Sequence, residues 1–526
     1  MPSAISVGAV MWLVSRQAGS WLRTPRGFRI RLHHYNKYMR IGNRRPWLIL
    51  AICCMSLLIV GTDSTIVNVA LPSIRRDLHA SLSGLQWSVD AYTLVIASFL
   101  MVSGSMGDRF GRRRVFQTGL ALFTLGSLLC SLAPNVILLV VFRCLQALGG
   151  SMLNPVALSI VSNTFTERKA RARALGIWGA VFGVSLALGP VLGGLLVTDV
   201  SWRAIFWINI PIGLAAIVLT QLFVPDSKAA VARRFDPWGQ LLVIAFLATL
   251  IYGLIEGPSA GWGSPLIVAM FAISAASAVT LVQVELRRTQ PLLEVRFFRS
   301  LPFSGASLIA VLAFGVLGGF LFLNTLYLQD ARGYSALHAG LLTLPMAVLI
   351  FVFAPISGRL VGSRGPRLPL VLAGVAIMAA SLLLIRLSDG TPVPWLLASY
   401  VVFGLGFGLV NAPISNTAVS GMPDSQAGVA ASVASASRQA GSALGVAICG
   451  SLIAGASNAG LAAASHAAWA VLAACGLGIV VLGWASTGPR ALATAQRVRE
   501  TLGGEAMGPG GPDREEEPHG AAVEGS

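Results

Sequence analysis

Apolar stretches long enough to cross a membrane recur along almost the whole of this 526-residue chain. A helix of roughly 20 apolar residues spans the hydrocarbon core of a bilayer. In lipid the backbone must satisfy its own hydrogen bonds, and a helix does so within one segment. Only 11% of the residues are charged, whereas a soluble chain carries roughly 25%. We therefore expect an all-α integral membrane protein.

The apolar stretches predict fourteen membrane-spanning helices, near residues 47–70, 85–106, 114–132, 136–160, 173–196, 204–223, 238–256, 265–285, 302–328, 338–361, 367–386, 393–415, 427–455 and 464–486. With the N-terminus inside, most of the 38 Lys and Arg residues fall on the cytoplasmic side, as the positive-inside rule requires. The net charge of +17 therefore indicates topology and not a nucleic-acid partner. We expect a multi-pass protein of the cytoplasmic membrane with both termini in the cytoplasm.

The two ends of the chain differ in composition from the middle. Residues 1–45 are basic and poor in acids. They predict a disordered cytoplasmic extension, and translation from Met39 is the alternative. Residues 491–526 contain Gly-Pro-Gly-Gly-Pro and a run of glutamates, a composition that predicts a disordered cytoplasmic tail.

A weak internal repeat divides the apolar region. The strings GSMGDRFGRRR at 104–114 and SGRLVGSRGPR at 357–367 each place two glycines seven residues apart before a basic cluster. Secondary transporters are commonly built from repeated halves. Because the two loops are eight spans apart instead of six, we expect two extra helices between the halves. The predicted domains are a six-helix bundle at 46–225, two additional helices with a linker at 226–300, and a second six-helix bundle at 301–490.

Three ionisable side chains fall inside predicted spans of the first half. At 1.5 Å per residue, Asp63 and Arg143 lie about 10 Å from the outer ends of their spans, and Asp90 lies about 7–8 Å from its own. A carboxylate at bilayer depth costs at least about 2.5–3.5 kcal/mol and survives mainly where it handles ions, substrates or protons. Buried charges within reach of each other should pair. We hypothesise a proton-coupling cluster in which Asp63 or Asp90 binds the proton and Arg143 favours the ionised carboxylate.

Structural alternatives exist for both acids. Asp90 snorkelling to the outer interface and Asp63 making a purely structural hydrogen bond remain open. Arg143 is followed on its helix by a narrow face of polar and small residues, which lie on one side because of the helical repeat. The candidate cavity residues of this half are Asn68, Gln146 and Asn154.

The loop at 104–114 combines small residues with an acid–base set. The glycines allow two helices to approach closely, and the charges at a cytoplasmic helix end can hold the halves in one conformation and release them in another. An ordinary basic cytoplasmic loop is the alternative. The predicted conformational latch consists of Gly104, Gly107, Asp108, Arg109, Gly111 and Arg112.

The span near 173–196 carries Gly189-Pro190 at its middle. Proline removes a backbone donor and glycine permits a bend, so this helix should kink. Such a kink suits a hinge between rocking halves, and close packing through small residues is the alternative. The predicted hinge consists of Gly183, Gly189, Pro190, Gly193 and Gly194.

In the second half, Arg438 lies near the middle of the span at 427–455, on one face with Gly441, Ser442 and Gly445. Charged groups within spans generally face the protein interior or a water-filled cavity. Arg438 is a candidate cavity residue, and hydrogen bonding to helix ends within its own bundle is an equal alternative.

Several of these strings resemble one family. The loop at 104–114 is similar to the signature loop of the major facilitator superfamily, and GTDSTIVNVALP at 61–72 resembles the first-helix motif of its fourteen-span drug:proton antiporter branch. Four further strings fit that branch: LQWSVDAYTL (85–94), GVSLALGPVLGG (183–194), SWRAIFWINIPIG (201–213) and SRQAGSALGVAI (437–448). One departure is Ala147, where the family usually has glycine.

The resemblance implies the major facilitator fold: two six-helix bundles around a central cavity, plus two additional central helices. It also implies alternating access and export of organic compounds against proton entry. The string Gly183–Gly194 resembles a motif found among antiporters and typically absent from symporters, which favours export.

Motifs for chemistry on the chain itself are missing from the sequence. There is no G-x-x-x-x-G-K-[ST] string for ATP hydrolysis, and the six histidines show no metal-ligand spacing. We expect no enzyme activity, no cofactor and no metal, so the energy must come from an ion gradient. The predicted partners are protons and small molecules, and the predicted function is proton-coupled export of hydrophobic, often cationic, compounds.

Two other functions remain open. The chain could export one dedicated metabolite, such as a self-made antibiotic. It could instead be a non-transporting receptor or sensor, which would need a soluble domain or a long ordered loop. The sequence between residues 46 and 490 predicts neither.

Overall fold

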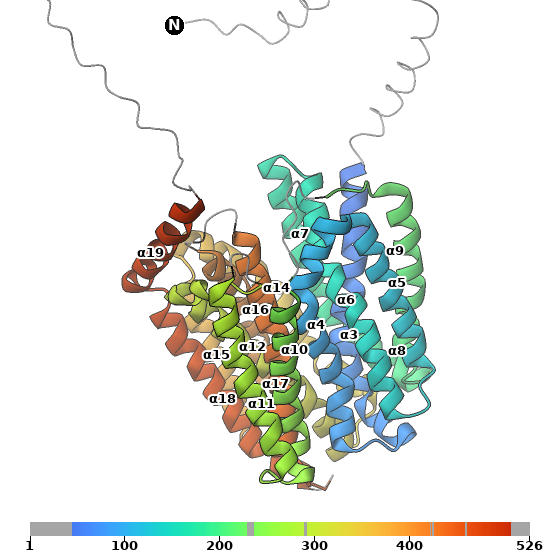
Figure 1. The fold of residues 1–526 in the computed structure, drawn as a ribbon. Helices are drawn as coiled ribbons and strands as arrows, with labels where there is room; N and C mark the ends of the chain where they lie inside the picture. Colours follow the sequence, from blue (N-terminus) through green and yellow to red (C-terminus); the bar gives the residue numbers. More distant parts are fainter. Residues whose placement is uncertain are drawn as a thin grey trace, which may run out of the picture. The chain divides into compact units, whose positions relative to one another are not determined.

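The computed structural model of the chain describes residues 45–228, 236–288, 292–420, 422, 426–457 and 460–506, and in this part every regular element is a helix (Figure 1). The chain divides into two units, Met1–Ile49 and Leu50–Ser526. Of the first unit only the opening turn of α3 is described, and the second contains all other helices. The predicted extension at 1–45 therefore lies outside the described residues, apart from Arg45.

The first half of the second unit consists of α3 (Arg45–Leu78) from Leu50 onward, α4 (Leu82–Phe110), α5 (Arg112–Ser131), α6 (Val136–Thr164), α7 (Arg168–Asp199), α8 (Ala204–Trp207) and α9 (Asn209–Phe223). The side chains of Ser81 and Asn135 cap α4 and α6 by accepting hydrogen bonds from backbone N–H groups of the first turn. Helix α6 packs against α4 and α5, and α5 also packs against α9. Helix α3 meets α7, where the Thr62 hydroxyl donates to the Ser185 carbonyl oxygen over 3.3 Å.

Two helices separate the halves along the chain, α10 (Pro237–Ala260) and α11 (Pro265–Arg287). Each begins with a capping residue followed by proline, whose missing N–H costs nothing at that position. They pack against each other, and α10 also packs against α4 and against α17 of the second half. The Gln240 side chain donates to the Ser98 carbonyl oxygen of α4 over 2.9 Å.

The second half begins with a short 3₁₀ helix, η2 (Val295–Arg299), and continues through α12 (Leu301–Leu326), the π-helical turn η3 (Tyr327–Ala331), α13 (Ala336–Leu342), α14 (Leu344–Arg364), α15 (Arg367–Leu384), α16 (Val393–Val419), α17 (Ala427–Leu452) and α18 (Leu461–Ala485). A continuous apolar core runs through this half and includes the buried rings of Phe320, Phe403 and Trp469.

The packing order of the first half recurs in the second. Helix α14 packs against α16, α15 packs against α16 and α18, and α12 packs against α17. The matching pairs in the first half are α4 with α6, α5 with α6 and α9, and α3 with α7. Between the halves, α4 packs against α17 and α7 packs against α14, so exchanging the halves preserves the contacts. This repeat is typical of secondary transporters, while the domain boundaries stay a prediction.

Every predicted span overlaps one or two helices, and several extend one to three residues beyond the helix end. By length and composition, twelve helices in the described part of the chain could cross a membrane. The helices at 112–131 and 427–452 are not among them: α5 begins with three arginines, and α17 is rich in alanine, serine and glycine. The number of fourteen crossings therefore stays a prediction.

Some predicted spans are interrupted. The span at 204–223 breaks at Ile208, and the span at 338–361 breaks at Thr343. Pro211 and Pro345 follow these breaks and cannot donate the backbone hydrogen bonds that would continue the preceding turn. The span at 302–328 ends in η3, a geometry that often marks functional sites.

The predicted disorder of the tail does not hold for residues 491–506, which belong to α19 (Pro489–Ala506). Ala491, Ala495 and Val498 are buried at helical spacing, and the Leu301 N–H donates to Thr494 Oγ1 over 2.9 Å. The glycine–proline and glutamate strings that predicted disorder begin after residue 507, outside the described residues. The prediction was wrong for residues 491–506 because the disorder indicated by the later strings was assigned also to this neighbouring amphipathic segment.

Candidate functional site

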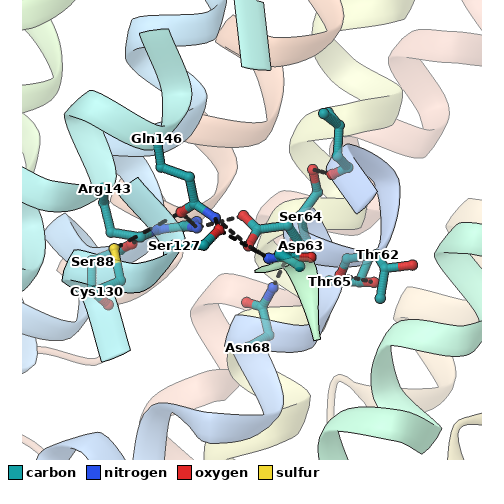
Figure 2. A network of polar contacts seen from close by, with 12 residues as sticks. Thr62, Asp63, Ser64, Thr65, Asn68, Ser88, Ser127, Cys130, Arg143 and Gln146 are labelled. Carbon is teal, nitrogen blue, oxygen red and sulfur yellow. Dashed lines mark hydrogen bonds and ion pairs between the residues drawn. The ribbon is translucent and has the colours of Figure 1, made fainter. Parts of the chain in front are cut away.

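A buried ion pair joins Asp63 on α3 to Arg143 on α6. Arg143 Nη1 donates to Asp63 Oδ2 over 2.5 Å (Figure 2). The arginine side chain is 2% exposed and the aspartate side chain is fully buried. Isolated charges are costly at such a place, so a buried pair needs close geometry and further hydrogen bonds.

The Asp63 carboxylate receives two of these further hydrogen bonds at Oδ1. Gln146 Nε2 donates to it over 2.8 Å, and Asn209 Nδ2 at the start of α9 donates over 3.1 Å. Both amides also lie within hydrogen-bond distance of Ser127 Oγ on α5. The negative charge is therefore held by donors from two helices besides its own.

The Arg143 guanidinium is equally well satisfied. Its Nε donates to the Ser88 carbonyl oxygen of α4 over 3.1 Å, and its Nη1 donates to Gln146 Oε1 over 2.8 Å. Its central carbon lies 4.1 Å from the centre of the Tyr92 ring, within the range of a cation–π contact. Helices α3, α4, α5, α6 and α9 thus converge on a single charge-neutral network.

Asp90 is not part of this network. On α4 it lies about 160° around the helix from Ser88 and from Tyr92, the two residues that face Arg143. One turn before it, Gln86 donates to the Ala447 carbonyl oxygen of α17 over 3.1 Å. Asp90 is fully buried, which rules out snorkelling, and neither carboxylate oxygen has a hydrogen-bond partner among the described residues. The structure therefore brings together two members of the predicted cluster and leaves the third on another face.

Sequence reasoning missed Asn209 and Ser127. Asn209 is a polar residue in an apolar stretch and belongs to the string SWRAIFWINIPIG, so a signal was available. Ser127 gave none, because a single serine in a span is ordinary. Its contact with Gln146 depends on how α5 packs against α6.

The predicted latch residues make their contacts within the first half. Asp108 pairs with Arg112 over 2.8 Å, one turn away. The Arg112 N–H donates to the Ser227 carbonyl oxygen, just after α9, over 2.9 Å. A side chain at Gly107 would touch Val156 of α6 at 3.0 Å. Gly104 comes near Pro155, and Arg109 is exposed. Contact of this loop with the second half stays a prediction.

Gly111 joins α4 to α5 with φ at 106°, a conformation that side chains rarely adopt. A Cβ there would also lie 2.7 Å from Asp226 Oδ1. We expect Gly111→Ala to lower the unfolding free energy by about 1–3 kcal/mol, measured by thermal unfolding in detergent. Gly390→Ala is the control, because nothing lies within 4 Å of its Cβ position. Equal stability of the two variants would contradict the strain argument.

The predicted hinge glycines lie where α7 meets other helices. Cβ atoms at Gly189 and Gly193 would collide with Thr65 and Ile66 of α3. A Cβ at Gly194 would lie 2.7 Å from the Ala336 carbonyl oxygen of α13, and one at Gly183 would lie 3.6 Å from Phe351 of α14. Helix α7 continues through Pro190 without a break. These glycines therefore permit close packing, and their role as a hinge stays a prediction.

The two halves touch at the ends that the sequence predicts to be extracellular. Gln329 of η3 donates to the Val69 carbonyl oxygen over 2.9 Å, and the Leu337 N–H donates to Thr198 Oγ1 over 3.1 Å. Asp330 lies 3.6 Å from Arg75 at the end of α3. These contacts hold the predicted outer end of α3 against η3 and that of α7 against α13.

Glycines nearer the predicted inner ends of α7 and α14 have free space beside them. Cβ positions at Gly176 and Gly179 of α7, and at Gly358 and Gly362 of α14, have no atom within 4 Å. The close approach of α7 to α14 at Gly183 and Phe351 is therefore not repeated at these four positions.

Three other candidate residues occupy separate places. Asn68 lines a small pocket with Asn324 and Gln329, where α3, α7, α12 and α13 meet. Asn154 is half-buried on α6, and its Oδ1 has no hydrogen-bond partner in the described part of the chain. Arg438 lies on α17 in the second half. The structure does not gather them into one site.

The sequence profile described as Major Facilitator Superfamily matches residues 53–446 of the chain. The multidrug resistance protein Stp of Mycobacterium tuberculosis (strain CDC 1551 / Oshkosh) is 38% identical over 412 residues, covering 78% of this chain and 76% of that protein. The tetracenomycin C resistance and export protein of Streptomyces glaucescens is 39% identical over 415 residues, covering 78% of this chain and 76% of that protein.

Solved structures with a similar arrangement of helices are transporters. The D-xylose-proton symporter superposes with a TM-score of 0.60 at 15% sequence identity, covering 83% of this chain and 97% of the symporter. The peptide transporter POT in complex with sulfate superposes with a TM-score of 0.61 at 16% identity, covering 86% of this chain and 95% of the peptide transporter. At these identities the likeness concerns the fold alone.

Proposed function

The chain belongs to the Major Facilitator Superfamily, and from this premise we propose that it exports hydrophobic small molecules, drugs among them, across the cytoplasmic membrane in exchange for protons. The family consists of multi-pass membrane transporters of small molecules. The direction of transport is supported by the names of relatives, which are a multidrug resistance protein and an antibiotic resistance and export protein. The proposed topology has both termini in the cytoplasm, as the distribution of Lys and Arg indicates.

The observation that carries the proton coupling is the Asp63–Arg143 network. A carboxylate buried at this depth is kept where it handles protons or ions. Ionised Asp63 accepts hydrogen bonds from Arg143, Gln146 and Asn209. A proton on Asp63 would remove its negative charge and leave the buried Arg143 cation without a counter-ion. The protonated and ionised networks therefore favour different arrangements of α3, α6 and α9.

The difference between the protonated and the ionised network drives the alternation between two conformations of the transporter. In the ionised state, the five helices are held around one neutral pair, and the halves are closed at their predicted outer ends. Protonation from the outside weakens that pair, and release of the proton to the inside restores it. One proton moving down 100 mV yields about 2.3 kcal/mol, and one pH unit adds about 1.4 kcal/mol, which together support roughly 500-fold accumulation.

A second candidate is a dedicated exporter of one metabolite. The observation that favours it is the relative named for resistance to and export of tetracenomycin C alone. Transport of several unrelated dyes would contradict this alternative.

The test uses the full chain purified into liposomes with its predicted cytoplasmic side outward. An outward-directed proton gradient should drive accumulation of rhodamine 123 or fluorescein inside the liposomes, and each molecule taken up should be accompanied by proton release. A protonophore should abolish the accumulation. Accumulation of either dye that persists with the protonophore would contradict proton coupling, and uptake of neither dye would contradict export of such compounds.

A further inference from the structure

Arg438 is the one charged side chain that lies deep inside a helix in the described part of the second half. It stands near the middle of α17 (Ala427–Leu452). The other charged residues that the structure describes between 301 and 485 lie in loops or near helix ends: Asp330, Arg332, Arg359, Arg364, Arg367, Arg386 and Asp389. The second half therefore keeps one positive charge in its interior.

The described neighbours of Arg438 do not neutralise that charge. Its Nη1 donates to Ser435 Oγ over 3.1 Å and its Nη2 donates to Ser415 Oγ of α16 over 2.6 Å. Its Nε is buried and has no hydrogen-bond partner among the described residues. The guanidinium carbon lies 5.9 Å from the centre of the Phe314 ring. Hydroxyl groups and a ring face give partial stabilisation, but they bring no negative charge.

The first half shows what a satisfied arginine looks like in the same chain. Arg143 has a carboxylate, a carbonyl oxygen and an amide oxygen as acceptors, and its counter-ion is built into the fold. Arg438 has an unused donor and no built-in counter-ion in the part of the chain that the structure describes. A guanidinium in this position is suited to pair with a carboxylate, because its planar donors match two oxygens at once.

The position of Arg438 makes it reachable from the predicted cytoplasmic side. Ser415 is exposed, and Arg438 itself is half-buried. Side chains on a helix lean toward its N-terminus, and the N-terminus of α17 is the predicted cytoplasmic end. On α14, which packs against α16, the Cβ positions of Gly358 and Gly362 face open space. An exporter would load its cargo from this side.

Asn411 is a further polar residue near Arg438 and Ser415. Asn411 lies one turn from Ser415 on the same side of α16, and its Oδ1 also lacks a hydrogen-bond partner among the described residues. Its amide can donate as well as accept. Arg438, Ser415 and Asn411 together offer donors from two helices to one acceptor group.

We infer that Arg438, with Ser415 and Asn411, binds an organic anion, so that the exporter selects molecules carrying a carboxylate or a phenolate. This rests on the proposed function, because it names the substrate class of that transporter. It also replaces the often cationic class of compounds that the sequence suggested with an anionic class. Asp63 has its charge taken up by Arg143, whereas the charge of Arg438 is open to a ligand.

The test compares two dyes that share a xanthene core, the anion fluorescein and the cation rhodamine 123. Binding to the purified full chain in detergent is followed by fluorescence anisotropy, for the native protein, Arg438→Gln and Arg438→Lys. The matched control is Arg386→Gln, which removes the same charge from an exposed position. We expect Arg438→Gln to raise the Kd of fluorescein by about tenfold or more, the loss of one charge-assisted hydrogen bond. The Kd of rhodamine 123 should stay within about twofold, since no contact with a cation is lost.

Each outcome decides the inference. Arg438→Lys should recover part of the fluorescein affinity, because it keeps the charge and loses the fork of donors. An unchanged ratio of the two Kd values in Arg438→Gln would overturn the inference, and so would equal weakening of both dyes or no binding of fluorescein to the native protein. Proton-driven transport of rhodamine 123 with an unchanged ratio would leave the proposed function standing and remove only the anion site.

Discussion

Replacing Asp63 by asparagine is expected to abolish proton-driven accumulation of substrate while leaving a folded protein that still exchanges substrate downhill. Asparagine has nearly the shape of aspartate, but it cannot bind and release a proton at neutral pH. The Arg143 cation, now without its counter-ion, should lower the unfolding free energy by about 3–5 kcal/mol. Accumulation in liposomes driven by a proton gradient, and downhill exchange at several pH values, measure the two consequences.

The double variant Asp63→Asn/Arg143→Gln separates coupling from folding. Removing both charges eliminates the unpaired cation, so thermal stability should recover most of the loss. Transport against a gradient should remain absent, because no titratable group replaces Asp63. Recovery of uphill transport in the double variant would show that Asp63 serves only to hold Arg143, and uphill transport by Asp63→Asn itself would remove Asp63 from the mechanism.

Replacing Gly194 by valine is expected to hold the transporter open at its predicted outer side. A Cβ at this position would lie 2.7 Å from the Ala336 carbonyl oxygen and 2.8 Å from Leu337 Cα. These are backbone atoms of α13, which cannot turn away as a flexible side chain can. Overpacking of this kind costs about 1–3 kcal/mol, and here it penalises only the closed arrangement. The open fraction should therefore rise roughly 5- to 150-fold.

The measurement uses Val69→Cys, a position that is 5% exposed beside the outer contact with Gln329. In a background without the six native cysteines, a thiol reagent added from outside should label this residue faster in Gly194→Val. The matched control is Gly176→Val on the same helix, where nothing lies within 4 Å of the Cβ position. Equally fast labelling in the control, or an unchanged labelling rate in Gly194→Val, would contradict the closed outer contact.

The pairing of Asp63 with Arg143 was within reach of sequence reasoning. Both residues lie about 10 Å from the outer ends of their predicted spans. Opposite charges buried at one depth have few partners other than each other. The contact found at 2.5 Å agrees with that expectation, and its role in proton coupling stays a prediction.

The placement of Asp90 needed more than depth. Its depth along the membrane is similar to that of Arg143, but the direction of a side chain also depends on its angle around the helix. Ser88 and Tyr92 face Arg143, so Asp90, two residues from each, points about 160° away. Which face of α4 meets α6 and which meets α17 depends on the packing of whole helices.

The sequence alone determined where the helices run, because the length of an apolar stretch and the polar or proline residues at its ends are local properties. It also placed Asp63, Asp90 and Arg143 within helices, because each lies inside such a stretch. Only the tertiary structure decided which buried charge has a counter-ion. That depends on the angles at which distant helices pack: Arg143 pairs with Asp63, whereas among the described residues Arg438 donates only to hydroxyl groups.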